Sequence, residues 1–255
     1  MMSKVDELNK LFKEWQDAQE NEADGSLAKT ISGCNIKKDF FEIDGIIDED
    51  AYSSEVIKVL FISAEANAND YNAKKGVSKT DYRSSYSEYF KNNHDDWKGK
   101  MRERICGIYK YLTKQNGIPL HQLANRFAVM DINKRGGMAT IDKGKHLVEY
   151  TRLYKNFISK EIEIINPDVI VLVGVNLCKL RIMQELGCRE YENKCFFDIN
   201  GKEVPILLSL QTANVQFQAK RYPPIEERDN RTIGILCSYL KKEIEKYHIW
   251  ETYFK

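Results

Sequence analysis

Hydrophobic and polar positions along the chain follow two patterns, and the first is the spacing of an α-helix. In residues 4–20, apolar side chains such as Leu8 and Trp15 recur on one helical face, which predicts an amphipathic helix. The same reading predicts further helices at about 98–115, 147–165, 176–186 and 226–247. The helix over 147–165 should end at the sequence INPD, because the residue before a proline is disfavoured in the helical region.

The second pattern is a short apolar run, which occurs four times. The runs are 56–63 (VIKVLFIS), 127–133 (FAVMDIN), 168–174 (DVIVLVG) and 204–210 (VPILLSL). The third run is almost wholly apolar and β-branched, as a parallel strand covered on both faces requires. A hairpin with Asn200-Gly201 at its turn is expected to lead into the fourth run. Strands that alternate with helices predict a layered α/β domain with a mostly parallel sheet.

This order of elements indicates one domain over residues 1–255, with an N-terminal helical extension (1–54) and an α/β core (55–248). A chain of 255 residues that is 42% hydrophobic can fill such a core. Its 39 basic and 38 acidic residues leave a formal net charge of +1. The overall charge therefore neither favours nor excludes a nucleic acid partner.

Composition also limits the location and the cofactors that we expect. No apolar run approaches the roughly 20 residues of a membrane helix, and the start, MMSKVDELNK, lacks the apolar segment of a signal peptide. We therefore expect a cytoplasmic protein without membrane association. The six cysteines form no C-x-x-C pair and the four histidines no H-x-x-H pair, so reduced thiols, no metal and no cofactor are expected.

Polar side chains gather directly after the predicted strands. The sequence VLFISAEANANDYN, residues 59–72, runs from an apolar strand into Glu65, Asn67, Asn69 and Asp70. In an open parallel sheet, ligands bind at the carboxyl ends of the strands. The other polar residues at these exits are Asp131, Asn133, Gln211 and Asn214. We expect them to converge on one cleft, although loops are polar for general reasons as well.

The arrangement of these segments resembles the uracil-DNA glycosylase superfamily over about residues 56–240. LFISAEAN occupies the place of the first motif, FAVMDINKR that of the second strand, INPDVIVLVG that of the third, and LQTANVQ that of the last motif. The resemblance implies a three-layer α/β/α sandwich around a four-stranded, mostly parallel sheet. The chain departs from the family pattern where it has Ser63 for a glycine, Ala66 for a proline, and Gln211 or Asn214 for a histidine.

The resemblance also implies roles for the residues after the first and last strands. A DNA glycosylase flips its target base into a pocket before it hydrolyses the bond between base and sugar. The transition state needs a carboxylate or amide near the sugar and hydrogen-bond donors near the departing base. The expected catalytic residues are Glu65, then Asp70, with Asn67 positioning water, and Gln211 and Asn214 as donors to the base. Alternatively, Glu65 or Asp70 caps the next helix.

Asp131 lies where the family has an asparagine that reads the base. A carboxylate only accepts hydrogen bonds, so it suits a base with an exocyclic amine, such as cytosine, better than uracil. Asn133 and the ring of Tyr71 are the other expected base contacts. Alternatively, Asp131 pairs with Lys134 or Arg135, or points outward.

Two segments are candidates for contacts with the DNA backbone. The sequence NKRGGMATIDKGKH carries Lys134, Arg135, Lys143 and Lys145, and its glycines would let backbone amides approach phosphate. After the last motif, Phe217 and Arg221 could press into the minor groove. The alternative for the first segment is an ordinary solvated loop.

The sequence thus predicts a monofunctional DNA glycosylase that flips a base from double-stranded DNA, without an obligate protein partner. A modified cytosine, such as the glucosylated hydroxymethylcytosine of some phage genomes, is the expected substrate, and abasic sites are the product. That substrate would imply antiviral defence. The alternatives are a uracil or mismatch repair glycosylase, a catalytically inactive nucleotide- or DNA-binding member of the fold, and a different α/β hydrolase of nucleotides.

Overall fold

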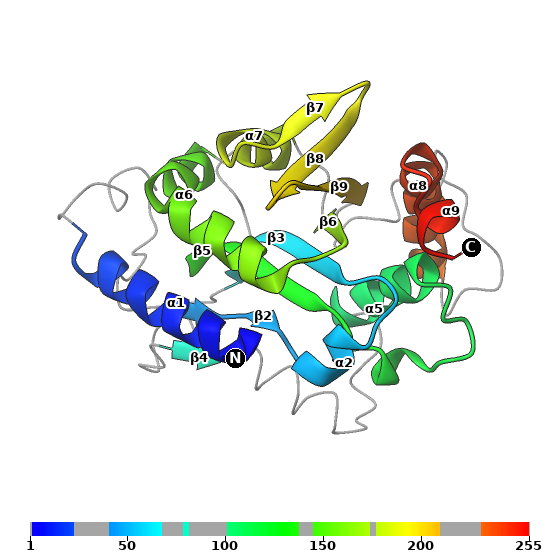
Figure 1. Cartoon of the computed structure of the whole chain (residues 1–255), viewed down its shortest axis with the longest axis horizontal. Coiled ribbons are helices and arrows are strands. Elements are labelled where there is room, and N and C mark those ends of the chain that lie inside the picture. Colours follow the sequence, from blue (N-terminus) through cyan, green and yellow to red (C-terminus); the bar gives the residue numbers. More distant parts are fainter. Residues whose placement is uncertain are drawn as a thin grey trace.

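The computed structural model describes residues 2–22, 41–67, 79–81, 101–137, 145–173, 177–209 and 231–254 (Figure 1). Its centre is a seven-stranded sheet in the order β2-β5-β3-β6-β9-β8-β7. The strands of this sheet are β2 (Gly45–Ile46), β3 (Val59–Asn67), β5 (Ala128–Gly137), β6 (Val169–Val173), β7 (Arg189–Tyr191), β8 (Lys194–Ile199) and β9 (Lys202–Ser209). A separate pair is formed by β1 (Phe41–Ile43) and β4 (Lys79–Asp81).

The four predicted strands form the parallel centre of this sheet. β5, β3, β6 and β9 are neighbours in that order, and each of the three pairs is parallel. The α/β class is confirmed, but the prediction of a four-stranded sheet is wrong. β2 adds an antiparallel strand beside β5, and β8 and β7 extend the other edge as antiparallel strands. β2 has only two residues and all three residues of β7 are exposed, so neither carries an apolar pattern that a sequence reading could detect.

Helices cover both faces of the sheet (Figure 1). The long helices are α1 (Lys4–Glu20), α5 (Met101–Leu112), α6 (Lys145–Ile165), α7 (Leu177–Glu185) and α8 (Arg231–Lys246). Side-chain alternation along β3 divides the core, because Leu60 and Ile62 belong to the cluster under α1 and α6, whereas Val59 and Phe61 belong to the cluster under α5 and α8. The short helices are α2 (Glu49–Ser53), the 3-10 turn η2 (Leu120–Gln122) and α9 (Ile249–Tyr253). None of the helices in the described ranges is long and apolar enough to cross a membrane.

The predicted N-terminal helix is confirmed as α1, and it packs against α6. Ser3 caps it by accepting a hydrogen bond from the backbone N–H of Asp6 at 3.1 Å. Its Trp15 is fully buried and stacks on Phe157 of α6, with ring centroids 5.5 Å apart. The described part of the N-terminal extension therefore shares a core with the sheet.

The predicted hairpin turn between β8 and β9 is also confirmed. Asn200 and Gly201 have φ values of 52° and 82°. Two successive positive φ angles are the mark of the type I′ turn, which asparagine and glycine adopt most easily.

Strands β3 and β5 continue beyond the runs 56–63 and 127–133 in which they were predicted. β3 pairs with β6 over Val59–Ile62 but with β5 as far as the pair Asn67↔Gly137. Glu65 was predicted to follow the first strand, and its backbone instead belongs to that strand and pairs with Asn133 of β5. The pairing of β3 with β5 therefore extends beyond the described pairing of β3 with β6 at the carboxyl edge of the sheet.

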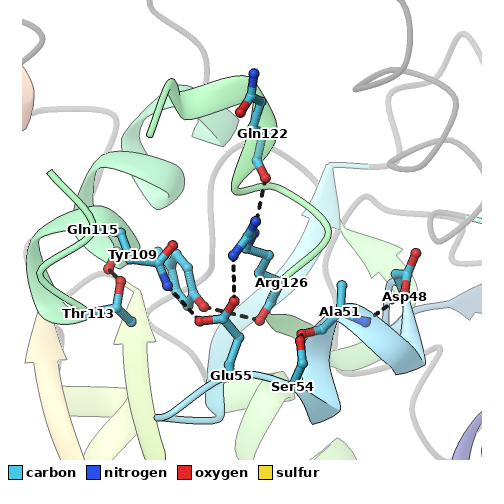
Figure 2. A network of polar contacts seen from close by, with 9 residues as sticks. All are labelled: Asp48, Ala51, Ser54, Glu55, Tyr109, Thr113, Gln115, Gln122 and Arg126. Atoms are coloured by element: carbon cyan, nitrogen blue, oxygen red, sulfur yellow. Dashed lines mark hydrogen bonds and ion pairs between the residues drawn. The ribbon is translucent and has the colours of Figure 1, made fainter. Parts of the chain in front are cut away.

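A polar cluster fixes the opposite, amino-terminal end of these strands (Figure 2). The carboxylate of Glu55 accepts hydrogen bonds from Arg126 Nη1 at 2.9 Å and Gln115 Nε2 at 2.6 Å. The hydroxyl of Tyr109 donates to the carbonyl oxygen of Arg126 at 3.3 Å. Burial, with the nearby charge of Glu55, raises the pKa of Tyr109 far above its ordinary value. The hydroxyl thus stays protonated.

This cluster gives a stability prediction that is independent of function. Glu55→Ala should lower the free energy of unfolding by about 2 kcal/mol, because it removes hydrogen bonds to a charged group that is largely buried. The measurement is urea unfolding followed by circular dichroism. Glu163→Ala, at an exposed pair with Lys160, is the matched control and should change stability by less than about 0.5 kcal/mol. Equal effects in the two variants would contradict this account.

Candidate functional site at the carboxyl ends of the strands

Polar side chains from β3 and β5 meet where these strands leave the sheet. Ser63 and Asp131 are partners in the strand register, and the Ser63 hydroxyl donates a hydrogen bond to Asp131 Oδ1. Asn133 lies two residues further along β5 and is only 2% exposed. Because alternate residues of a strand share a face, Asp131 and Asn133 lie on the same side as Val129, which faces α5 and α8. Asp131 itself is half-buried, so solvent reaches it.

Glu42 on β1 joins this group, although the sequence analysis did not single it out. β1 lies beside β5, and the Glu42 carboxyl lies close to that of Asp131 and is only 1% exposed. Burial, followed by the negative charges of Asp131 and Asp44, raises the pKa of Glu42 well above its ordinary value. Glu42 therefore holds its proton more tightly than an exposed glutamate does. An acidic residue inside the apolar sequence DFFEI was the available signal.

Asp44 holds the backbone of Asp131 in place. Its Oδ2 accepts a hydrogen bond from the Asp131 backbone N–H at 2.7 Å, and its Oδ1 accepts one from Lys134 Nζ at 2.5 Å. The second contact continues to Glu161 of α6, whose two carboxylate oxygens lie 3.0 and 3.1 Å from Lys134 Nζ. β5, α6 and the segment after β1 are thus joined by one buried cation.

The expectation that Lys134 contacts DNA is wrong. Lys134 is fully buried, and its ammonium lies 5.3 Å from the ring centroid of Phe12 and 5.5 Å from that of Trp15. Strand alternation turns it toward α1 and α6, away from Asp131 and Asn133. Burial lowers the pKa of Lys134, but the carboxylates of Asp44 and Glu161 outweigh that effect and leave the pKa raised. The lysine is therefore a charged core residue.

The pKa of Glu161 gives a pH-dependent prediction. Burial and then the charge of Asp44 raise this pKa well above its ordinary value of 4.5, despite the attraction of Lys134. Because the folded protein binds this proton more tightly than the unfolded chain does, Glu161 favours folding most below pH 4.5. This contribution is lost as the pH rises through the pKa that Glu161 has in the folded protein. Relative to the unsubstituted protein, Glu161→Gln should become progressively more stable as pH rises from 4.5. Urea unfolding at several pH values would measure this, and a pH-independent difference would contradict it.

Of the remaining predicted site residues, some have a described backbone and the others lie wholly outside the described residues. Glu65 and Asn67 lie on β3 opposite Asn133 and Gly137, which places their backbones beside the Asp131 group, while their side chains lie outside the described residues. The side chains of Arg135 and Lys145 also lie outside them. Other predicted contacts fall in segments that are not described, and these are Asp70, Tyr71, Lys143, Gln211, Asn214, Phe217 and Arg221.

The described side chains at this site are acids, hydroxyls and amides. Within the described ranges, no group of three or more histidine, cysteine, aspartate or glutamate side chains is arranged to hold a metal ion. No model of a known protein family matches the chain, and no curated protein matches it closely enough to be called a relative.

Proposed function

We propose that this protein is a DNA glycosylase that hydrolyses the N-glycosidic bond of a flipped base bearing an exocyclic amine. The observation that carries the proposal is the half-buried Asp131 at the carboxyl end of the parallel strands, bonded by Ser63 and beside the buried acid Glu42. Ligands of open α/β sheets bind at this edge. The resemblance of the sequence to the uracil-DNA glycosylase superfamily motivates the reaction class, and the four neighbouring parallel strands β5, β3, β6 and β9 are compatible with it.

The proposed chemistry divides between the two strands β5 and β3. Asp131 of β5 accepts a hydrogen bond from the base, and Asn133 stands beside it. Glu65 of β3 holds the hydrolytic water and stabilises the positive charge that develops on the sugar, with Asp70 and Asn67 assisting. The register that pairs Glu65 with Asn133 brings sugar and base contacts to neighbouring strands. A modified cytosine of phage DNA is the proposed substrate, and defence against phage in the cytoplasm is the proposed role.

The experiment uses DNA duplexes that each carry one test base: uracil, cytosine, hydroxymethylcytosine or glucosylated hydroxymethylcytosine. Alkaline strand cleavage detects abasic sites. We expect them at a modified cytosine, and we expect Glu65→Gln to lower the rate at least 100-fold, as loss of a positioned acid or base does. Asp70→Asn ranks the second carboxylate. DNA binding without abasic sites at any base would reject the enzyme in favour of a binding protein.

A further inference from the structure

Two cysteines at the edge of the sheet lie in contact with each other, outside the candidate site. The sulfur atoms of Cys188 and Cys195 are 3.1 Å apart, and neither cysteine forms a disulfide in the structure. Cys195 is buried, whereas Cys188 is half-buried, so solvent reaches the pair through Cys188. A reactive thiol that meets solvent and has a second cysteine beside it is the usual arrangement of a redox-sensitive site.

The backbone of Cys188 is fixed by the end of α7. Its N–H donates to the carbonyl oxygen of Met183 at 2.9 Å, and the N–H of Gly187 donates to that of Gln184 at 2.9 Å. Gly187 has a φ of 88°, in the left-handed region that glycine adopts without strain. These two bonds and this glycine form the Schellman motif that ends many helices, and they give Cys188 a defined position just before β7.

The backbone of Cys195 is held by Tyr247, which follows α8. The Cys195 N–H donates to the Tyr247 hydroxyl at 2.6 Å, and this hydroxyl donates to the Cys195 carbonyl oxygen at 3.3 Å. In the hairpin of β7 and β8, Cys195 is paired with Glu190, two positions after Cys188. This register places the two cysteines diagonally on one face of the hairpin. Hydrogen bonds therefore hold both backbones where the sulfur atoms meet.

The contact between the thiols also affects their ionisation. It lowers the pKa of Cys195 and raises that of Cys188, because a thiolate at one sulfur is stabilised by the thiol at the other. Burial and the charge of Glu190 oppose the change at Cys195 without reversing it. The thiolate is the form of cysteine that attacks an oxidant. The contact thus favours a nucleophilic sulfur with a second sulfur beside it.

We propose that Cys188 and Cys195 form an oxidation site that a peroxide converts reversibly into an intrachain disulfide. One sulfur attacks an oxygen of hydrogen peroxide, the O–O bond breaks, and a sulfenic acid and one water molecule form. The second sulfur then attacks the sulfenic sulfur, the S–S bond forms, the S–O bond breaks, and a second water molecule leaves. The two sulfur atoms together lose two electrons, which the peroxide oxygens gain. A dithiol reverses the reaction by thiol–disulfide exchange.

The disulfide would fasten the edge of the sheet. β7 is the last strand in the order of the seven-stranded sheet, and the bond would join the residue before it to β8, seven positions further along the chain. Because the sulfur atoms are already in contact, the fold need not rearrange. A cross-link restricts the unfolded chain, so oxidation should stabilise the folded protein. This inference does not depend on the proposed glycosylase function.

The test oxidises the reduced full-length protein with hydrogen peroxide, alkylates the remaining thiols, and digests the protein with trypsin without reduction. Trypsin cuts after Arg189 and Lys194, so the two cysteines fall in separate peptides, 182–189 and 195–202. Mass spectrometry should find these peptides joined, two hydrogen atoms lighter than their sum, and dithiothreitol should separate them. Oxidation should also raise the Tm by about 5 °C, and dithiothreitol should reverse that rise.

Cys188→Ser and Cys195→Ser are the test variants, and Cys106→Ala is the matched control. Thermal unfolding of the reduced proteins shows that each variant folds. Each serine variant should lose both the joined peptide and the rise in Tm. Cys106 is fully buried on α5, and Cys106→Ala should keep both. A rise in Tm that persists in the serine variants would overturn the proposal. Bonds from Cys188 or Cys195 to another cysteine, or peroxide treatment that leaves the two peptides separate, would overturn it as well.

Discussion

Replacement of Lys134 by methionine is expected to lower the free energy of unfolding by about 3–5 kcal/mol. Methionine keeps most of the side-chain length but removes the ammonium, which lies 2.5 Å from Asp44 and 3.0 Å from Glu161. Asp44 and Glu161 then lose the cation that pairs with them, and removing one partner of a buried pair is strongly destabilising. Guanidinium unfolding followed by fluorescence measures the loss.

Lys160→Met is the control for the loss of a lysine from the same region. Lys160 lies on α6, its side chain is 57% exposed, and it pairs with Glu163 at 3.1 Å. A surface pair of this kind contributes at most about 1 kcal/mol. If Lys134→Met were no more destabilising than Lys160→Met, the buried cation would not hold β5, α6 and Asp44 together as described.

Asp131→Asn is expected to lower the preference for an amine-bearing base about 100-fold, because discrimination by a well-placed hydrogen-bonding group reaches 1–3 kcal/mol, or about 5- to 150-fold. An asparagine amide can donate to the O4 of a uracil as well as accept, so activity on hydroxymethyluracil should rise relative to hydroxymethylcytosine. The ratio of kcat/KM for the two bases measures the change.

Asp198→Asn provides the matched control. Asp198 lies on β8, its side chain is 46% exposed, and it pairs with Arg189 at 3.1 Å. It should leave the ratio unchanged. An Asp131→Asn protein that folds, cleaves and retains the original preference would show that Asp131 does not read the base.

Local sequence patterns predicted much of the fold. The run 168–174 became β6, and the Asn200-Gly201 turn has the backbone angles that its residues favour. Such features depend only on residues that are close together in the chain, so they can be recognised in a single sequence. β2 and β7 were missed because their pairing depends on strands distant in the chain and their side chains carry no periodic signal.

The candidate site was predicted only in part, for the same reason. Asp131 and Asn133 were expected together, since they follow one strand. The partners of Lys134 are Asp44, 90 positions away in the chain, and Glu161, 27 positions away. Its neighbours in the sequence are an arginine and two glycines, so the segment had the composition of a surface loop. The position of Glu42 beside Asp131 depends on β1 lying against β5, which no local pattern indicates.

The central claim is that this protein releases a base from DNA, and identification of the released molecule tests it most directly. The unsubstituted protein would be incubated with duplex DNA containing glucosylated hydroxymethylcytosine, and the small-molecule fraction analysed by mass spectrometry. The account predicts the free modified base, in the same amount as the abasic sites left in the DNA, and none from DNA with unmodified thymine alone. Release of a nucleotide or of the sugar modification alone, or no release by a protein that binds the DNA, would contradict it.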